Sequence, residues 1–178
     1  MNLVCLDLIN TEWALTHPPN RELLNDPKWV RDFLVRWGLP ADFAITADQS
    51  SELIELRTLL SQAATAIDQH DRPTAEQIEQ INRRLAATPL QSQLQEHDDC
   101  FRLSVSPVSD DWSAVLYQIT ASFADLLAVR DVKRLKRCDN PDCQWIFYDE
   151  SKNSTRRWCC NTCASLIKVR RFRSKQKA

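Results

Sequence analysis

Glycine is almost missing from this chain of 178 residues, whose only glycine is Gly38. Average usage of about 7% would give roughly a dozen. Phosphate-binding P-loops, dinucleotide fingerprints and the G-x-S-x-G nucleophile elbow all need several glycines close together, so the sequence excludes these sites. Tight hairpin turns also depend on glycine, and its scarcity favours helices joined by turns of Pro, Asn and Asp. A mainly α fold is therefore expected.

Four segments of the first 130 residues carry apolar side chains at helical spacing. Asp26 and Pro27 are typical of a helix start, and Gly38 can supply the left-handed residue that ends the same helix. Thr46 and Thr74 are each followed three residues later by Gln, which is the spacing of a capping box. The predicted helices cover residues 26–38, 46–67, 74–85 and 110–130.

The segment 90–106 has a different pattern. Phe101, Leu103 and Val105 alternate with polar residues, which indicates a half-buried strand and predicts a short β-hairpin. Together with the helices, it predicts a helical N-terminal domain over residues 1–130. No unbroken apolar run reaches the roughly 18 residues of a membrane span, so we expect no membrane partner.

Charge is divided unevenly along the chain, although the formal net charge is −1. Residues 130–178 carry 14 Lys and Arg against 5 Asp and Glu, whereas residues 1–129 carry 9 against 19. A basic tail on an acidic body suggests a segment that binds a polyanion. Two other interpretations stay open, in which the tail is simply solvated or is attracted to the acidic body.

Arg57 and Asn82 lie on the apolar stripes of predicted helices. A buried guanidinium needs a carboxylate partner, and the acidic residue of the apolar first segment is Asp7, close to Asn10. One interpretation is an internal ion pair between Arg57 and Asp7 that fixes the order of the helices. The other is a small polar pocket, lined by Asp7, Asn10, Arg57 and Asn82, that senses a small-molecule effector.

Five of the seven cysteines fall between residues 138 and 163. The N-terminus has no basic n-region and carries Asp7 where a signal peptide is apolar, so we expect a cytoplasmic protein without a disulfide framework. In such a chain, two close cysteine pairs separated by a short loop indicate a tetrahedral metal site. The expected ligands are Cys138, Cys143, Cys159 and Cys163, with Cys160 as an alternative to Cys159.

The residues around these cysteines predict a treble-clef-like zinc finger over residues 131–178. An Asp-Asn-Pro-Asp turn can bring the first two sulfurs together, and Trp145, Phe147 and the segment around Trp158 alternate like a short hairpin. The second cysteine pair lies at the start of a helix predicted from about 164 to 175. Four thiolates leave no open coordination position, so Zn²⁺ would be structural and we expect no enzyme.

A zinc-dependent hydrolase is the enzymatic alternative. It would need His ligands and an open coordination position. His17, His70 and His97 are far from the cysteines and from one another in sequence, and none lies in an H-E-x-x-H pattern. The sequence therefore favours a structural zinc site.

Basic residues accumulate around and after the last cysteine. They flank an apolar seam of Leu166, Val169 and Phe172 that can pack on the hairpin. A rigid basic helix beside a metal-fixed turn suits the phosphates of duplex DNA and could enter a major groove. The alternative is a protein-interaction module, in which the finger recruits a protein partner or docks on its own acidic body. The candidate nucleic-acid-binding residues are Arg156, Arg157, Lys168, Arg170, Arg171, Arg173 and Lys175.

These motifs resemble a known family. The stretch from Cys138 to Cys163, with CDNPDCQWIFYD, RRWC and a basic helix behind the last cysteine, resembles the CGNR zinc finger of bacterial proteins. The preceding residues look like the helical ABATE domain of that family, through LDLINT, WVRDFLVRWGL, ELIELRTLL, INRRLA and ADLLAVRDVKRLKRC. The resemblance divides nearly the whole chain into an ABATE-like domain, 1–130, and a CGNR-like finger, 131–178.

The resemblance implies a stress-related transcription regulator whose finger binds DNA. We expect the body to act as a ligand sensor or as the dimerisation unit of a homodimer. One departure is that the family has Gly-Asn-Arg after the last cysteine, where this chain has Ala164-Ser165-Leu166. This change removes one basic residue and the glycine at the helix start. The residues that match the family's zinc ligands are Cys138, Cys143, Cys159 and Cys163, and those that match its recurrent polar positions are Asp7, Asn10, Arg57 and Asn82.

Overall fold

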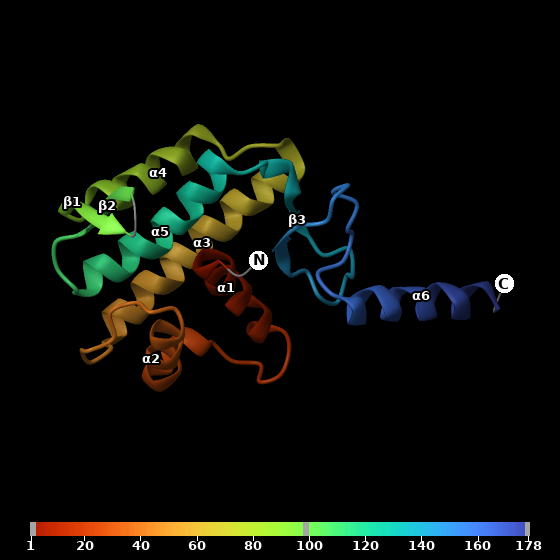
Figure 1. Ribbon diagram of the computed structural model, residues 1–178. Coiled ribbons are helices and arrows are strands. Elements are labelled where there is room, and N and C mark those ends of the chain that lie inside the picture. The colour runs from red at the N-terminus through yellow and green to blue at the C-terminus, as the bar shows by residue number, and fades with distance from the viewer. Residues whose placement is uncertain (1–2, 98–99, 177–178) are drawn as a thin grey trace.

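The computed structural model describes residues 3–97 and 100–176, except for the side chains of His97 and Lys175. Helices make up most of the structure, and two antiparallel hairpins accompany them (Figure 1), which confirms the mainly α fold. The elements in chain order are α1 (Val4–Asn10), η1 (Thr11–Leu15), η2 (Leu23–Asn25), α2 (Pro27–Arg36), α3 (Ala47–His70), α4 (Ala75–Ala86), β1 (Leu90–His97), β2 (Cys100–Pro107), α5 (Trp112–Val129), η3 (Val132–Arg134), β3 (Leu135–Arg137), β4 (Ile146–Tyr148) and α6 (Asn161–Lys175).

The predicted helix starts are confirmed by their capping hydrogen bonds. The Asp26 carboxylate accepts from the backbone N–H groups of Lys28 and Trp29 at the start of α2. Both capping boxes are present, because the Thr46 and Thr74 hydroxyls accept from the backbone of the Gln three residues later and each Gln side chain accepts in return. Local sequence alone therefore places the starts of α2, α3 and α4.

Helices α1, α3 and α5 form the centre of the body, and α4 packs on α3 and α5 (Figure 1). The core consists of fully buried apolar side chains such as Phe33, Leu56 and Phe123. Leu135 of β3 and Ile146 of β4 belong to the same core. The C-terminal hairpin is therefore anchored on the body by apolar packing.

Helix α5 is long and apolar enough to cross a membrane by length and composition alone. A core helix of a soluble protein meets the same criterion, and α5 buries Val115, Ile119 and Phe123 against the rest of the body. Of this segment, 33% is buried, and a single helix of this kind is weak evidence for a membrane span.

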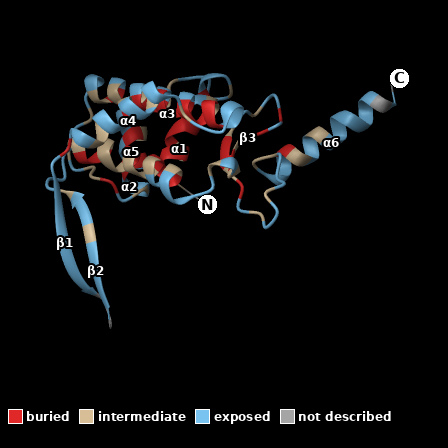
Figure 2. Cartoon of the chain, turned by 90° about the horizontal axis from the view of Figure 1, so that it is seen from above, coloured by how far each residue is buried: buried red, intermediate tan, exposed pale blue. Residues whose placement is uncertain are grey.

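The β1–β2 hairpin projects from the body, and its apolar face is exposed (Figure 2). Leu94 lies opposite Leu103, and Phe101 and Val105 lie two residues to either side of Leu103, so all four side chains share one face. Their exposed fractions are 65% for Leu94, 69% for Phe101, 70% for Leu103 and 54% for Val105. The prediction of a half-buried strand is wrong, because no element of the described chain covers this face.

The predicted pairing of the C-terminal hairpin is also wrong. Strand β4 pairs with β3, with Leu135 opposite Tyr148, and the segment around Trp158 forms no strand. Asp149 follows β4 directly and is buried. Its carboxylate accepts hydrogen bonds from the Lys136 side chain of β3 and from the backbone N–H of Arg156. These bonds fold the chain after β4 into a loop, which prevents a second strand there.

Helix α6 extends from the finger into solvent (Figures 1 and 2). The apolar seam expected to pack on the hairpin is instead exposed, by 46% at Leu166, 46% at Val169 and 63% at Phe172. The seam is at the correct helical spacing, but Leu135 of β3 and Ile146 of β4 pack in the core of the body, and Phe147 of β4 packs with Cys163 at the start of α6. The seam further along α6 is therefore left uncovered in the described chain.

Candidate metal centre and nucleic-acid interface

Four sulfur atoms converge where the finger meets α6. The sulfurs of Cys138, Cys143, Cys159 and Cys163 all lie within 4.8 Å of one another. The Cys143 and Cys159 sulfurs are 3.7 Å apart, and those of Cys159 and Cys163 are 3.8 Å apart. A tetrahedral zinc ion with Zn–S bonds of about 2.3 Å requires sulfur separations of about 3.8 Å. The donor set and its spacing therefore suit a structural Zn²⁺.

Asn140 shapes the turn that carries the first two cysteines, and sequence analysis did not single it out. It is buried, its side-chain oxygen accepts from the backbone N–H of Asp142, and its carbonyl accepts from the backbone N–H of Cys143. Its amide group also lies 3.5 Å from the Cys163 sulfur, as a donor. Asn140 thus links both halves of the metal centre, and the Asn-Pro step in this turn was the available signal.

Two thiols of the cluster, those of Cys143 and Cys159, have raised pKa values. Burial raises the pKa of Cys143 to about 11. Burial, with the negative charge of Cys138 as a second cause, raises the pKa of Cys159 far above its ordinary value. A divalent cation stabilises the thiolates, so zinc binding must release protons from this cluster. Four sulfurs fill the tetrahedral shell, which leaves no position for a reacting water.

Cys160 stands outside the group of four. It is exposed, and its sulfur lies 3.8 Å from that of Cys159. It precedes α6 directly as the N-cap residue. Of the two predicted ligand sets, the structure therefore brings together the sulfurs of the one that contains Cys159, and the Cys160 sulfur lies beside them.

The basic side chains of α6 are exposed around the helix. The side chains of Lys168, Arg171 and Arg173 have no hydrogen-bond or ionic partner within the described residues. Arg170 differs, because it forms an ion pair with Asp142 of the cysteine turn. Lys175 is the last helical residue, and its side chain lies outside the described part.

Arg156 and Arg157 are held against the finger. The Arg157 guanidinium lies over the Trp158 ring and pairs with Asp139. Arg156 lies over the Phe147 ring and donates a hydrogen bond to the carbonyl of Cys159. Both arginines are exposed, so these contacts orient the guanidinium groups beside the metal centre.

The expected ion pair between Arg57 and Asp7 does not form. Arg57 is buried and donates two hydrogen bonds to the Glu22 carboxylate, at 2.8 and 2.6 Å. Asp7 instead accepts from the Trp37 indole and pairs with Arg36. The prediction was wrong because Glu22 lies in an irregular segment before η2, where no periodic pattern marks a buried partner.

Asn10 and Asn82 also separate from Arg57, so the four predicted residues do not form one pocket. The Asn10 side chain donates to the carbonyl of Ile146 at 2.9 Å and accepts from its N–H at 2.8 Å. It therefore joins α1 to strand β4 of the finger. Asp7 shares a small cavity with Asn10, whereas Asn82 is exposed on α4.

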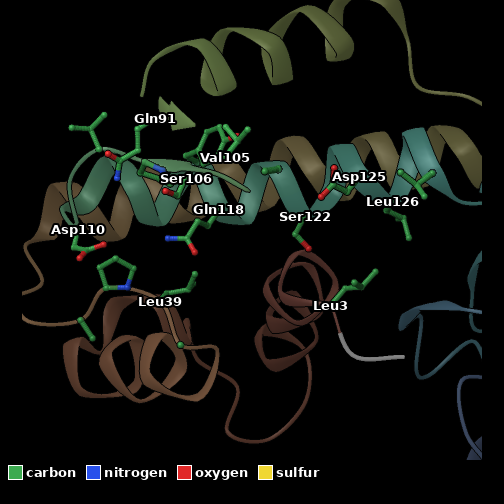
Figure 3. Close-up of a pocket in the computed structure, with 18 of the residues that line it drawn as sticks. Leu3, Leu39, Gln91, Val105, Ser106, Asp110, Gln118, Ser122, Asp125 and Leu126 are labelled. Carbon is green, nitrogen blue, oxygen red and sulfur yellow. The ribbon is translucent and has the colours of Figure 1, made fainter. Parts of the chain in front are cut away.

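A large open groove lies elsewhere on the body, with a volume of about 1280 Å³. It runs between α5, the loop after α2 and the base of the β1–β2 hairpin (Figure 3). Gln118 of α5 points toward Leu39 of the loop, Ser122 points toward α1, and Val105 of the hairpin borders the groove. None of the predicted site residues lines it. Because Val105 also belongs to the exposed hairpin face, the groove and that face are continuous.

A helical body joined to a four-cysteine metal centre and a basic helix defines a zinc-finger protein. The chain belongs to the ABATE family, described as "Putative stress-induced transcription regulator", whose model matches residues 2–130. The model of the CGNR zinc finger matches residues 134–176. These matches confirm the family resemblance and support Zn²⁺ as the cofactor of the finger. No curated protein matches the chain.

Proposed function

We propose that this protein is a cytoplasmic regulator of transcription that binds duplex DNA through its finger and α6. The observation that carries the proposal is the free basic surface of α6. Lys168, Arg171 and Arg173 are exposed and unpaired within the described chain, and α6 contains no Asp or Glu. Such a helix attracts phosphates, and its width fits a major groove.

The metal centre would fix the direction of this helix. Cys163 lies in the first turn of α6, while Cys138 and Cys143 lie on the turn anchored to β3 and β4. Zinc bonds to all three would make α6 rigid relative to the finger, so that few degrees of freedom are lost when DNA binds. Arg156 and Arg157, oriented beside the same centre, would contact phosphates flanking the groove.

Fluorescence anisotropy with a labelled duplex across a range of salt concentrations tests the proposal. If five phosphates are neutralised, log affinity should fall with log salt at a slope of about −4.5. Replacing Lys168, Arg171 and Arg173 by Gln should reduce the slope to about −2. The matched control replaces Arg72, Arg83 and Arg102, which are exposed on the body and carry the same charge. No binding at low salt, or equal effects of both triple variants, would refute DNA binding by α6.

We further propose that the regulator is a homodimer, with a second copy covering the β1–β2 hairpin. Exposed apolar faces of this kind mark interaction sites, and an uncovered two-stranded hairpin has little stability of its own. A stable interface buries at least about 1,200 Å² in total, which the hairpin face and the adjoining groove of two copies would have to supply together.

Light scattering after gel filtration measures this association. Phe101→Ser with Leu103→Ser should convert the dimer into a monomer, whereas Val35→Ser, on α2 and 64% exposed, should leave it unchanged. A monomeric wild type at tens of micromolar would exclude the dimer.

A specific observation favours one rival function, in which α6 binds a protein. The seam of Leu166, Val169 and Phe172 is exposed on the same helix as the basic residues. Replacing these three residues by Ser should leave DNA affinity within about twofold if the basic side chains carry binding through phosphate contacts. A loss of DNA binding equal to that of the basic triple variant would count against the phosphate model.

We also propose that the protein is not an enzyme, since its metal centre is closed.

A further inference from the structure

A cavity of about 910 Å³ lies between the body and the finger. Its walls come from η1, the C-terminal half of α3 and the residues that follow the cysteine turn. Cys143, one of the four clustered cysteines, forms part of the wall. Cavities of this size between two structural units are the usual location of small-molecule sites.

Glu12 and Arg137, two of the charged residues that line this cavity, do not neutralise each other, whereas a third, Asp142, pairs with Arg170. The Glu12 carboxylate accepts a hydrogen bond from the Ser61 hydroxyl at 2.8 Å. The Arg137 guanidinium donates to the Thr65 hydroxyl at 2.6 Å. Neither charged group forms an ion pair within the described residues.

The two hydroxyls hold these charges over one face of α3. Ser61 and Thr65 are four residues apart on α3, hence on the same face and separated by about 6 Å along the helix axis. The arrangement leaves Glu12 and Arg137 near each other without an ion pair between them within the described residues. It suits a molecule that places an ammonium group and a carboxylate group between Glu12 and Arg137, with a charge-assisted hydrogen bond of about 2.8 Å at each end.

Aromatic rings supply the apolar part of the cavity. Trp13 and Trp145 meet edge to face, with ring centroids 6.3 Å apart, and Trp13 stacks on His17 at 4.1 Å. Trp13 follows Glu12 directly in the chain, so the apolar wall adjoins one of the two charges. Such a wall favours an apolar or aromatic substituent.

We propose that this cavity binds a free amino acid with an apolar or aromatic side chain, whose ammonium pairs with Glu12 and whose carboxylate pairs with Arg137. A carboxylate or an amine alone would satisfy one charge and leave the other unpaired. An amino acid satisfies both and places its side chain against the indole rings.

The cavity also offers a route from this ligand to the finger. Arg137 precedes Cys138 and donates a hydrogen bond from its guanidinium to the Gln144 side chain, next to Cys143. A carboxylate that draws the Arg137 side chain toward it would change this contact and alter the cysteine turn. An effect of the ligand on DNA affinity rests on the proposed function, whereas ligand binding itself does not.

Isothermal titration of the zinc-loaded full chain with L-phenylalanine tests the binding step. We expect phenylalanine to bind at least tenfold more tightly than 3-phenylpropionate, which lacks the ammonium group, and 2-phenylethylamine, which lacks the carboxylate. No binding of phenylalanine, leucine or tryptophan at millimolar concentration, or equal binding of all three phenyl compounds, would overturn the proposal. The titration contains no DNA, so neither of these two results depends on whether the protein binds DNA.

Two variants assign the charges. Glu12→Gln should weaken phenylalanine binding at least tenfold and leave phenylpropionate binding unchanged. Arg137→Gln should weaken phenylalanine binding and leave phenylethylamine binding unchanged, with circular dichroism confirming that it is folded. The matched controls are Glu55→Gln and Arg84→Gln, which lie on α3 and α4 outside the cavity and should not change any affinity. If neither Glu12→Gln nor Arg137→Gln changes phenylalanine binding, the assignment is wrong.

Discussion

The Asp149 carboxylate is fully buried and organises the loop that leads from β4 to the second cysteine pair. Burial by itself would raise the pKa of Asp149, but hydrogen bonds from Lys136, from Ser151 and from the backbone of Arg156 hold it well below its ordinary value. Sequence analysis missed this residue, because a single Asp after a short strand carries no signal of burial.

We expect Asp149→Asn to lower the free energy of unfolding of the zinc-loaded protein by about 3 kcal/mol at pH 7, since it leaves Lys136 without its charge partner. The folded pKa lies below the unfolded value of about 3.9. The stabilisation is therefore complete above about pH 4 and is lost as the pH falls through the folded pKa. Urea denaturation checks both points. Asp125→Asn, at an exposed position, is the control. If the loss in free energy of unfolding caused by Asp149→Asn varied between pH 5 and pH 8, this cause would be contradicted.

Arg57 provides a second prediction at the residue scale. Its side chain and that of Glu22 are 5% and 16% exposed. Arg57→Leu should lower the free energy of unfolding by about 3–5 kcal/mol, because it leaves the Glu22 carboxylate unpaired in a buried site. Adding Glu22→Gln should recover part of the loss, whereas adding Asp7→Asn should not. If adding Asp7→Asn recovered the lost stability instead, the result would support the pair between Arg57 and Asp7 that the sequence predicted. Thermal or urea denaturation of the double variants decides between them.

The two adjacent cysteines give the third prediction. Cys159→Ser should reduce bound zinc well below one ion per chain, because it removes one of the four clustered sulfurs. Cys160→Ser should leave the zinc content at one ion per chain. Elemental analysis after gel filtration measures both variants, and the reverse order of effects would show that Cys160 is the ligand.

At the scale of elements, local signals determined what could be predicted. The capping boxes at Thr46 and Thr74 and the left-handed Gly38 are contained within a few residues, and all three occur as expected. The spacing of the cysteines likewise predicts a metal cluster from local sequence alone. The short helix α1 had no such boundary signal and was not predicted.

Long-range pairing limited the prediction of the hairpins. The alternation in β2 identified an apolar face correctly but could not show whether anything covers it. Strand β4 pairs with β3 because Ile146 and Leu135 share the body's core and Asp149 turns the following chain away. Both outcomes depend on contacts between residues distant in sequence, and period-2 alternation carries no information about them.

At the scale of the whole molecule, two segments project from one core (Figure 2). The hairpin extends from one part of the body, while α6 extends from the finger away from the helices of the body (Figures 1 and 2). The finger is attached to the body by Asn10 and by Arg137, which donates to Thr65 of α3. The boundary between the two family matches therefore divides the sequence at 130–134, while the packing of β3 and β4 on the body joins the two parts.

We infer that four sulfurs and one zinc ion hold the finger and the base of α6 in a single conformation. Amide hydrogen exchange, measured with and without zinc, tests it most directly. We expect metal removal to abolish protection in residues 138–143 and 156–163 and at the start of α6, while β4, α3 and α5 stay protected by the core. Unchanged protection across residues 138–143 and 156–163 in the metal-free protein would contradict the claim.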